Sequence, residues 1–255
     1  MPKLNYEIVG HGPHVVLLHP VGLDLTFLST LANALKGSFT VLSVDQAGHG
    51  KSGIDRTAST LGDYADDLHA LLGELNFAPA ALIGFSFGGM VSQAFALKYP
   101  QDVSALVLSA CPSTLPAEGR PIARARGDDA RKSGMGAVLE ATLDRWFTAP
   151  FRAAGKDAPS RERLLTNNVE GWAQAWHAIG GIDYLPRLPT VSAPTLCIAG
   201  QRDKSSPPDI VKAIANAIPG ARYAELAGAP HMLFIEQPDN VARLAGDFLR
   251  QVLRR

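Results

Sequence analysis

The sequence predicts a single α/β domain in which a mostly parallel, doubly wound sheet carries helices on both faces. Short, continuous runs rich in Val, Ile and Leu are typical of strands that are buried on both faces of a parallel sheet. Segments with helical spacing of apolar residues separate these runs, and such an alternation implies right-handed crossovers. The chain of 255 residues, 46% hydrophobic and 19% charged, is large enough for one such domain with an inserted subdomain.

The predicted strands follow one another along the chain with helical patterns between them. They comprise an edge-like run at residues 4–10 and stronger runs at residues 14–20, 39–45, 80–85, 104–110, 194–200 and 221–228. Apolar residues recur at helical spacing from Leu61 to Leu75. Thr60 and Asp63 at the start of this segment resemble a capping box in which Asp takes the acidic position.

The regular alternation stops once, over residues 113–190. This segment holds the three tryptophans and helix-like stretches at residues 136–147 and 163–179, so we expect a mainly helical insertion. The core domain then comprises residues 1–112 and 191–255. Because the insertion joins two strands that reach the same edge of the sheet, it should cover the carboxyl edge and leave a small, closed pocket.

The first part of this insertion is locally basic, and it contains Arg120, Arg124, Arg126 and Arg131. Clusters of this kind are usually solvated surface. The alternative is that one of the four side chains points inward and pairs with a carboxylate of a bound molecule.

The overall charge and composition argue against several classes of protein. Lys plus Arg and Asp plus Glu both number 24, so no net field attracts nucleic acid or an anionic membrane. The first residues lack the layout of a signal peptide, and no apolar run approaches the roughly 20 residues of a membrane helix, which predicts a cytoplasmic protein. Cys111 and Cys197 are too few for a disulfide framework and resemble small buried hydrophobes rather than metal ligands.

The stretch LIGFSFGGMV places Ser86 between a predicted strand and a predicted helix. A sharp strand-to-helix turn strains its central residue and leaves room only for small side chains two residues away on either side. Gly84 and Gly88 occupy those two positions. The turn would present the Ser86 hydroxyl at the carboxyl edge of the sheet, beside a helix N-terminus that favours developing negative charge. The pattern predicts a nucleophilic serine.

A serine nucleophile needs a base that accepts its proton. Among the histidines, His231 alone follows the last predicted strand, in a loop that opens on the same edge as Ser86. His231 is therefore the predicted base. His19 and His49 flank loops at this edge as well, and we expect them to shape the site or to form hydrogen bonds there.

The base in turn needs an acid that orients it and balances its charge. Asp203 lies just past the predicted strand at residues 194–200 and is the predicted acid. Asp209 follows two prolines, where an acidic residue is better placed to begin a helix.

Two backbone amides should stabilise the oxyanion that forms during acyl transfer. Phe87 follows the nucleophile directly and is predicted to supply one amide, and Val21 in the loop after the strand at 14–20 is predicted to supply the other. Trp172 and Trp176 lie four residues apart on a predicted helix, either as a packing face or as a wall of the substrate pocket. Phe85 is expected in the core beneath the nucleophile.

Taken in order, these motifs resemble those of the α/β-hydrolase family over essentially the full chain. The landmarks are HPVG at 19–22, DQAGHGKSG at 45–53, GFSFGG at 84–89, GQRD at 200–203 and AGAPHMLFIEQP at 227–238. The resemblance implies the chain order Ser, Asp, His for the catalytic residues and a mostly parallel, roughly eight-stranded sheet with a small helical cap at residues 113–190. Within the family, residues 84–110 and 167–200 are similar to 3-oxoadipate enol-lactonases and their esterase-like relatives.

The leading hypothesis is hydrolysis of a small carboxylic ester or lactone through an acyl-enzyme, with a small molecule as the partner and without a metal or an organic cofactor. The same triad would serve C–C bond hydrolysis of dienoate ring-cleavage products or perhydrolysis with peroxide. A ligand-binding receptor on a hydrolase fold is the alternative without catalysis, and turnover of an activated ester would distinguish it. Dehalogenases and epoxide hydrolases of this fold use an aspartate nucleophile, so Ser86 argues against both.

Overall fold

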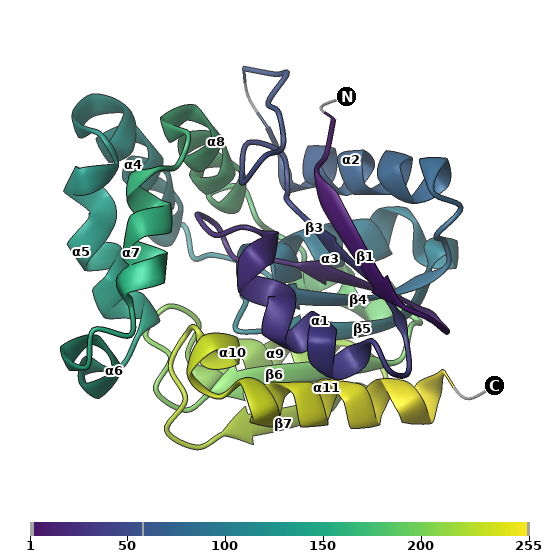
Figure 1. Cartoon of the computed structure of the whole chain (residues 1–255). Helices are drawn as coiled ribbons and strands as arrows, with labels where there is room; N and C mark the ends of the chain where they lie inside the picture. The colour runs from purple at the N-terminus through teal and green to yellow at the C-terminus, as the bar shows by residue number, and fades with distance from the viewer. Residues whose placement is uncertain (1–2, 58, 254–255) are drawn as a thin grey trace.

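A sheet of seven strands with helices on both faces forms the centre of the computed structural model, which describes residues 3–57 and 59–253 (Figure 1). The strands are β1 (Tyr6–Gly10), β2 (His14–Leu18), β3 (Thr40–Val44), β4 (Ala80–Phe85), β5 (Val103–Ser109), β6 (Thr195–Gly200) and β7 (Arg222–Leu226). Every strand overlaps one of the predicted runs. The family resemblance implied roughly eight strands, and the described residues form seven because each strand-forming run supplies one strand.

The strand order is β1-β3-β2-β4-β5-β6-β7, with β1 antiparallel to β3 and all other neighbours parallel. The chain runs from β2 outward to β3 and then returns to the other side of β2 to form β4. The loops that follow β2 and β4 therefore diverge at the carboxyl edge, which is where open α/β sheets form their binding crevices. The predicted doubly wound, mostly parallel fold is confirmed.

Helices of the core domain cover both faces of the sheet. On one face lie α1 (Ser29–Leu35) and α11 (Pro238–Val252), which pack against each other, and on the opposite face lie α2 (Leu61–Glu74) and α3 (Phe87–Lys98) (Figure 1). The predicted capping box at the start of α2 is present, because the Thr60 and Asp63 side chains each accept a hydrogen bond from the other's backbone amide. The remaining core elements are η1 (Leu25–Leu28), η2 (Pro100–Asp102), α9 (Pro208–Ala217) and α10 (Leu233–Glu236).

The segment between β5 and β6 is mainly helical. It contains α4 (Gly119–Ser133), α5 (Met135–Trp146), α6 (Ala149–Ala153), α7 (Ala158–Leu165), α8 (Val169–Ile179) and η3 (Leu185–Thr190). Helices α4 to α8 gather together beyond one end of the strands (Figure 1). The stretch at 163–179 was expected to be one helix, but it divides into α7 and α8 because the Asn168 side chain accepts a hydrogen bond from the Gly171 amide and caps a new helix.

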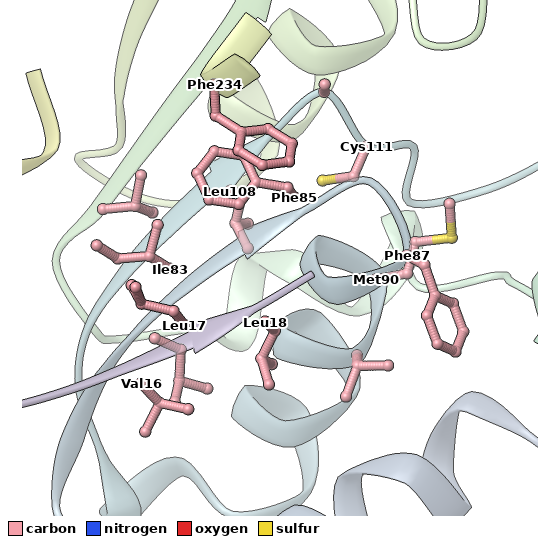
Figure 2. Close-up of a cluster of buried hydrophobic side chains, with 14 of the residues drawn as sticks. Val16, Leu17, Leu18, Ile83, Phe85, Phe87, Met90, Leu108, Cys111 and Phe234 are labelled. Carbon is pink, nitrogen blue, oxygen red and sulfur yellow. The ribbon is translucent and has the colours of Figure 1, made fainter. Parts of the chain in front are cut away.

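The central strands carry the apolar core. All six residues of β4 are buried. In Figure 2, the side chains of Leu17 from β2 and Ile83 from β4 lie side by side in the core. The ring of Phe85 packs against Phe234 with ring centroids 4.5 Å apart, which places it in the core as expected.

The turn between β4 and α3 is as tight as the sequence predicts. Ser86 has φ 51° and ψ −112°, a backbone conformation that costs a non-glycine residue about 1 to 3 kcal/mol. A Cβ atom at Gly84 would overlap with the carbonyl of Gly88, and one at Gly88 would overlap with the carbonyl of Leu18. The absence of side chains at both glycines therefore lets strand and helix meet closely enough to hold the strained serine.

We expect Gly84→Ala to destabilise the protein by about 3 kcal/mol, because the added methyl group meets backbone atoms that cannot move aside without opening the turn. The measurement is urea unfolding monitored by circular dichroism. Gly73→Ala is the matched control, since a Cβ at this exposed position in α2 meets open space and should stabilise the helix by about 0.5 kcal/mol. Equal stability of the two variants would contradict the packing argument.

Candidate active site

Ser86, His231 and Asp203 lie in a continuous hydrogen-bonded row at the carboxyl edge of the sheet. Ser86 Oγ is 2.9 Å from His231 Nε2, and His231 Nδ1 is 2.8 Å from Asp203 Oδ2. The three residues come from the loops after β4, β7 and β6, and their exposed fractions are 7%, 4% and 5%. The fold thus brings together groups that are up to 145 positions apart in the chain.

The contacts of Asp203 determine which nitrogen of His231 carries the proton. Asp203 Oδ1 accepts hydrogen bonds from the amides of Ser205 at 2.7 Å and Ser206 at 2.9 Å, which leaves Oδ2 toward the imidazole. Because a carboxylate only accepts hydrogen bonds, Nδ1 of His231 must donate. The lone pair of Nε2 then faces the Ser86 hydroxyl, the arrangement that a base needs. Asp209 lies instead in the first turn of α9.

The two predicted oxyanion amides flank Ser86 from neighbouring strands. Leu18 of β2 lies opposite Gly84 of β4, so the segments that carry Val21 and Phe87 begin at neighbouring positions of the sheet edge. Within residues 3–57 and 59–253, neither amide forms a hydrogen bond to a protein acceptor. Phe87 is the first residue of α3, where the helix dipole adds positive potential. Both amides are therefore free to donate to an oxygen atom at the site.

Hydrogen bonds of His19 stabilise the loop that carries Val21. Its Nε2 accepts a hydrogen bond from the Gln46 amide at 3.0 Å, and its Nδ1 donates to the Pro20 carbonyl at 2.7 Å. The Gln46 side chain returns a hydrogen bond to the His19 carbonyl at 2.7 Å. Burial lowers the pKa of His19 to about 4, so the ring is neutral and suited to these contacts. The part played by Gln46 was not predicted, since an isolated glutamine carries no sequence signal for this role.

His49 lies beside His19 in the same buried layer. Its ring centroid is 5.2 Å from that of His19 and 5.8 Å from that of Phe87, and its Nδ1 is 3.1 Å from the Ala47 carbonyl. Burial, followed by the nearby His19, lowers the pKa of His49 to about 3. Within the described chain neither histidine hydrogen-bonds to Ser86.

A cavity of about 180 Å³ adjoins the row of Ser86, His231 and Asp203. Its walls come from the core and from the helical insertion, and they comprise Val21, Ser86, Met90, Pro112, Leu115, Gly119, Ile122, Ala123, Arg126, Arg145, Trp146, Trp176, Ile179, Ser205, Ser206 and His231. Ile122 on this wall is 58% exposed, so the cavity reaches the surface beside α4.

The two tryptophans of α8 take different positions. Trp176 is among the residues that line the cavity, whereas Trp172 is not, so the two alternatives of packing face and pocket wall divide between the two side chains. The indole N–H of Trp172 donates to the Arg126 carbonyl at 3.0 Å, and the ring packs against Gly22 in the loop after β2. The two rings lie on one stripe of α8 with centroids 5.7 Å apart, and the axial rise of about 6 Å between the two residues places one at the cavity and the other at the loop.

Of the four arginines in the first part of the insertion, Arg126 alone lines the cavity. Arg120 pairs with Asp183, and Arg131 pairs with Glu170 and Asp128. Arg124 is exposed on α4 and borders a separate surface depression. A second cavity arginine, Arg145 of α5, was not predicted, because its direction depends on how the helices of the insertion pack.

Hydrogen bonds tie the insertion to both loops of the site. The Met232 amide donates to the Trp146 carbonyl at 3.0 Å, directly after His231. The Asn167 side chain donates to the Gly22 carbonyl at 2.8 Å, next to Val21. The insertion therefore contacts both the loop after β2 and the loop that carries His231.

The chain belongs to the α/β-hydrolase fold family, whose model matches residues 13–238. It is 24% identical to the 3-oxoadipate enol-lactonase 1 of Acinetobacter baylyi, over 98% of this chain and 94% of that protein. It is 28% identical to the pimeloyl-(acyl-carrier protein) methyl ester esterase of Chromobacterium violaceum, over 97% of this chain and 98% of that protein.

One of the solved structures that resemble this chain is also an enol-lactonase. The enol-lactonase from Burkholderia xenovorans LB400 has a TM-score of 0.92 and 31% identity, and the match covers 97% of this chain and 96% of that chain. The chain is also 32% identical, over 96% of its length, to a segment of the polyketide synthase ThaQ of Burkholderia thailandensis, and it spans 12% of that protein. Family and relatives define the chain as a hydrolase of the esterase and lactonase group.

Neither a membrane-spanning helix nor a cluster of metal-ligating side chains occurs within residues 3–57 and 59–253. None of the helices is both long and apolar enough to span a bilayer. No group of three or more His, Cys, Asp or Glu side chains in this part of the chain is arranged to hold a metal ion.

The low pKa of His49 predicts a pH-dependent stability. As the pH falls below 6.5, the unfolded chain binds a proton at His49 and the folded chain does not until the pH reaches about 3, so acid favours unfolding over this window. One proton corresponds to a slope of about 1.4 kcal/mol per pH unit in the free energy of unfolding. We expect His49→Asn to reduce this slope near pH 5 by about that amount.

Urea unfolding at several pH values between 4 and 6.5 measures the slope. Substitution of the exposed His11 by Asn is the control and should leave the slope as it is in the unmodified protein. A slope that His49→Asn does not change would show that His49 is protonated in the folded protein.

Proposed function

We propose that the protein hydrolyses a small carboxylic ester or lactone at Ser86 through an acyl-enzyme intermediate. The observation that carries the proposal is the hydrogen-bonded row from Ser86 Oγ through His231 to Asp203, which ends at the wall of a cavity. The enol-lactonase and methyl ester esterase among the relatives support the same class of substrate.

In the proposed mechanism, Ser86 Oγ attacks the carbonyl carbon while its proton passes to His231 Nε2. Asp203 stabilises the imidazolium that forms, and the amides of Val21 and Phe87 donate to the oxyanion. Collapse of the tetrahedral intermediate breaks the bond to the leaving oxygen, which takes the proton from His231. Water then attacks the acyl-enzyme with His231 again as the base, and the acid product leaves. With a lactone, the leaving oxygen stays attached to the acyl group.

We propose that residues 113–190 act as a cap that selects the substrate. Helices α4, α5 and α8 supply much of the cavity wall, and the cavity volume of about 180 Å³ lies below the roughly 300–1,000 Å³ that is usual for drug-sized ligands. A short acyl group fits such a space, whereas a long alkyl chain must extend out through the mouth.

Ser86→Ala should fold normally and lose at least about a thousandfold in kcat toward 4-nitrophenyl acetate, because only substrate binding and the oxyanion amides remain. Thermal unfolding checks the fold, and spectrophotometric assay measures the rate. A variant that keeps more than about a tenth of the activity would place the nucleophile elsewhere. If the unmodified protein turned over no activated ester, a role without catalysis would replace this proposal.

The acid is tested by a matched pair of aspartates. Asp203→Asn should lower kcat by about 10³ to 10⁴, because the amide nitrogen would donate to His231 Nδ1 and shift the imidazole proton to Nε2, the atom that must accept from Ser86. Asp209→Asn alters only the first turn of α9 and should keep nearly full activity. The reverse order of rates would rule out Asp203 as the acid.

Substrate size is tested with a series of 4-nitrophenyl esters from acetyl to palmitoyl. We expect kcat/KM to fall by more than about tenfold between the short and the long acyl groups, because the cavity holds only the former. Detergent-matched controls separate this effect from substrate solubility. Comparable kcat/KM for acetyl and palmitoyl esters would contradict selection by the cap.

A further inference from the structure

The end of α7 and the turn that follows it hold the loop after β2 from the side of the insertion. The Asn167 side chain, only 8% exposed, donates to the Gly22 carbonyl at 2.8 Å. Arg163 of α7 donates to Asn167 Oδ1 at 2.8 Å and forms an ion pair with Asp24 at 3.1 Å. Because a guanidinium only donates, this contact fixes the Asn167 amide with its nitrogen toward Gly22.

Apolar side chains of α7 and α8 pack on the same loop. A Cβ atom at Gly22 would lie 2.6 Å from the ring of Trp172 and 2.9 Å from Leu164 Cδ2. Gly22 has φ 79°, and the Leu23 amide donates to the Pro20 carbonyl at 3.3 Å, as in a type II turn with a left-handed third residue. The insertion thus fixes the position of this turn by packing as well as by a hydrogen bond.

The turn passes the contact with Asn167 on to Val21 through a line of hydrogen bonds. The Gly22 carbonyl and the Leu23 amide belong to one peptide unit. The Pro20 carbonyl and the Val21 amide belong to another. Both units are trans, so the C=O and N–H of each point in opposite directions. Asn167 donates to the first unit, which donates to the second, so the direction of the Val21 N–H depends on Asn167.

This line would also make the Val21 amide a stronger donor, because hydrogen bonds in a chain polarise one another. Within residues 3–57 and 59–253, Asn167 is the sole donor to the Gly22 carbonyl, and Gly22 is buried. A buried carbonyl without a partner is unfavourable, so loss of the Asn167 donor should turn this peptide unit away from its present direction. The Leu23 amide would then move off the Pro20 carbonyl.

We propose that Asn167 is a positioning residue that directs the Val21 amide toward the oxyanion. The inference rests on the proposed function, which supplies the reaction at Ser86. It gives the helical insertion a part in stabilising the transition state. Removal of an entire oxyanion donor lowers kcat by about 10² to 10³, so misdirection of one donor should lower kcat at least about tenfold.

The kinetic test uses Asn167→Asp, whose carboxylate still accepts from Arg163 but cannot donate to Gly22. We expect kcat toward 4-nitrophenyl acetate to fall at least about tenfold while KM changes less than about threefold, because the lost contact acts in the transition state. Asn167→Ala should show the same split between kcat and KM, and it provides the test if the carboxylate variant does not fold.

Asn168→Ala is the matched control. Asn168 lies in the same turn, and its side chain accepts a hydrogen bond from the Gly171 amide and caps α8. Loss of this cap should lower the unfolding temperature and leave kcat within about twofold of the unmodified protein. If both Asn167 variants had the kcat of Asn168→Ala, the positioning role would be overturned and hydrolysis at Ser86 would stand.

Inhibition by 1,1,1-trifluorobutan-2-one tests the oxyanion itself. This ketone forms a tetrahedral adduct with a serine nucleophile, and the adduct oxygen takes the place of the reacting oxyanion. Its inhibition constant should rise in Asn167→Asp by about the factor by which kcat/KM falls. An inhibition constant equal to that of the unmodified protein would contradict the inference.

Hydrogen exchange of the Leu23 amide, followed by NMR without substrate, is independent of turnover. The amide should exchange at least about tenfold faster in Asn167→Asp than in the unmodified protein or in Asn168→Ala. Unchanged exchange would overturn the link between Asn167 and the turn. Faster exchange in a protein that hydrolyses no ester would support this link and overturn the proposed reaction.

Discussion

The close contact between β4 and the start of α3 determines where every group of the candidate site can lie. Gly84 and Gly88 let the two elements approach within backbone contact, and the fully buried strand and the largely buried helix on either side hold Ser86 at φ 51°. Such strain persists only where the surrounding packing over-determines the backbone. The same turn aims the hydroxyl out of the sheet and exposes the first amide of α3, so the proposed nucleophile and one of the two proposed oxyanion donors come from one constraint.

The remaining groups depend on the parallel arrangement of the sheet around that turn. The loop after β2 brings Val21 beside Ser86, and its position is held by hydrogen bonds among His19, Pro20 and Gln46. The loops after β6 and β7 bring Asp203 and His231 to the same edge. The low pKa values of the buried His19 and His49 keep this support neutral.

The helical insertion supplies much of the wall of the cavity at the carboxyl edge of the sheet, including two arginines. Asn167 donates a hydrogen bond to Gly22 in the loop after β2, and Trp146 accepts one from Met232 beside His231, so the insertion is held to two of the loops at the candidate site. Several of its other arginines pair with carboxylates, among them Arg131 and Arg152, whereas Arg126 and Arg145 line the cavity. In the proposed function, the core positions the reacting groups and the helical insertion supplies much of the cavity wall.

The sequence by itself determined the strands, the turn at Ser86 and the candidates His231 and Asp203, because each of these follows from local pattern and from chain order. Parallel strands end at one edge, so a residue just past a strand can be assigned to the site without coordinates. Only the tertiary structure decided that Trp176 lines the cavity while Trp172 packs behind it, and that Arg126 and Arg145 line the cavity as well. These outcomes depend on how α4, α5 and α8 pack on one another, and contacts between helices distant in sequence leave no periodic signal that distinguishes an inward arginine from a solvated one.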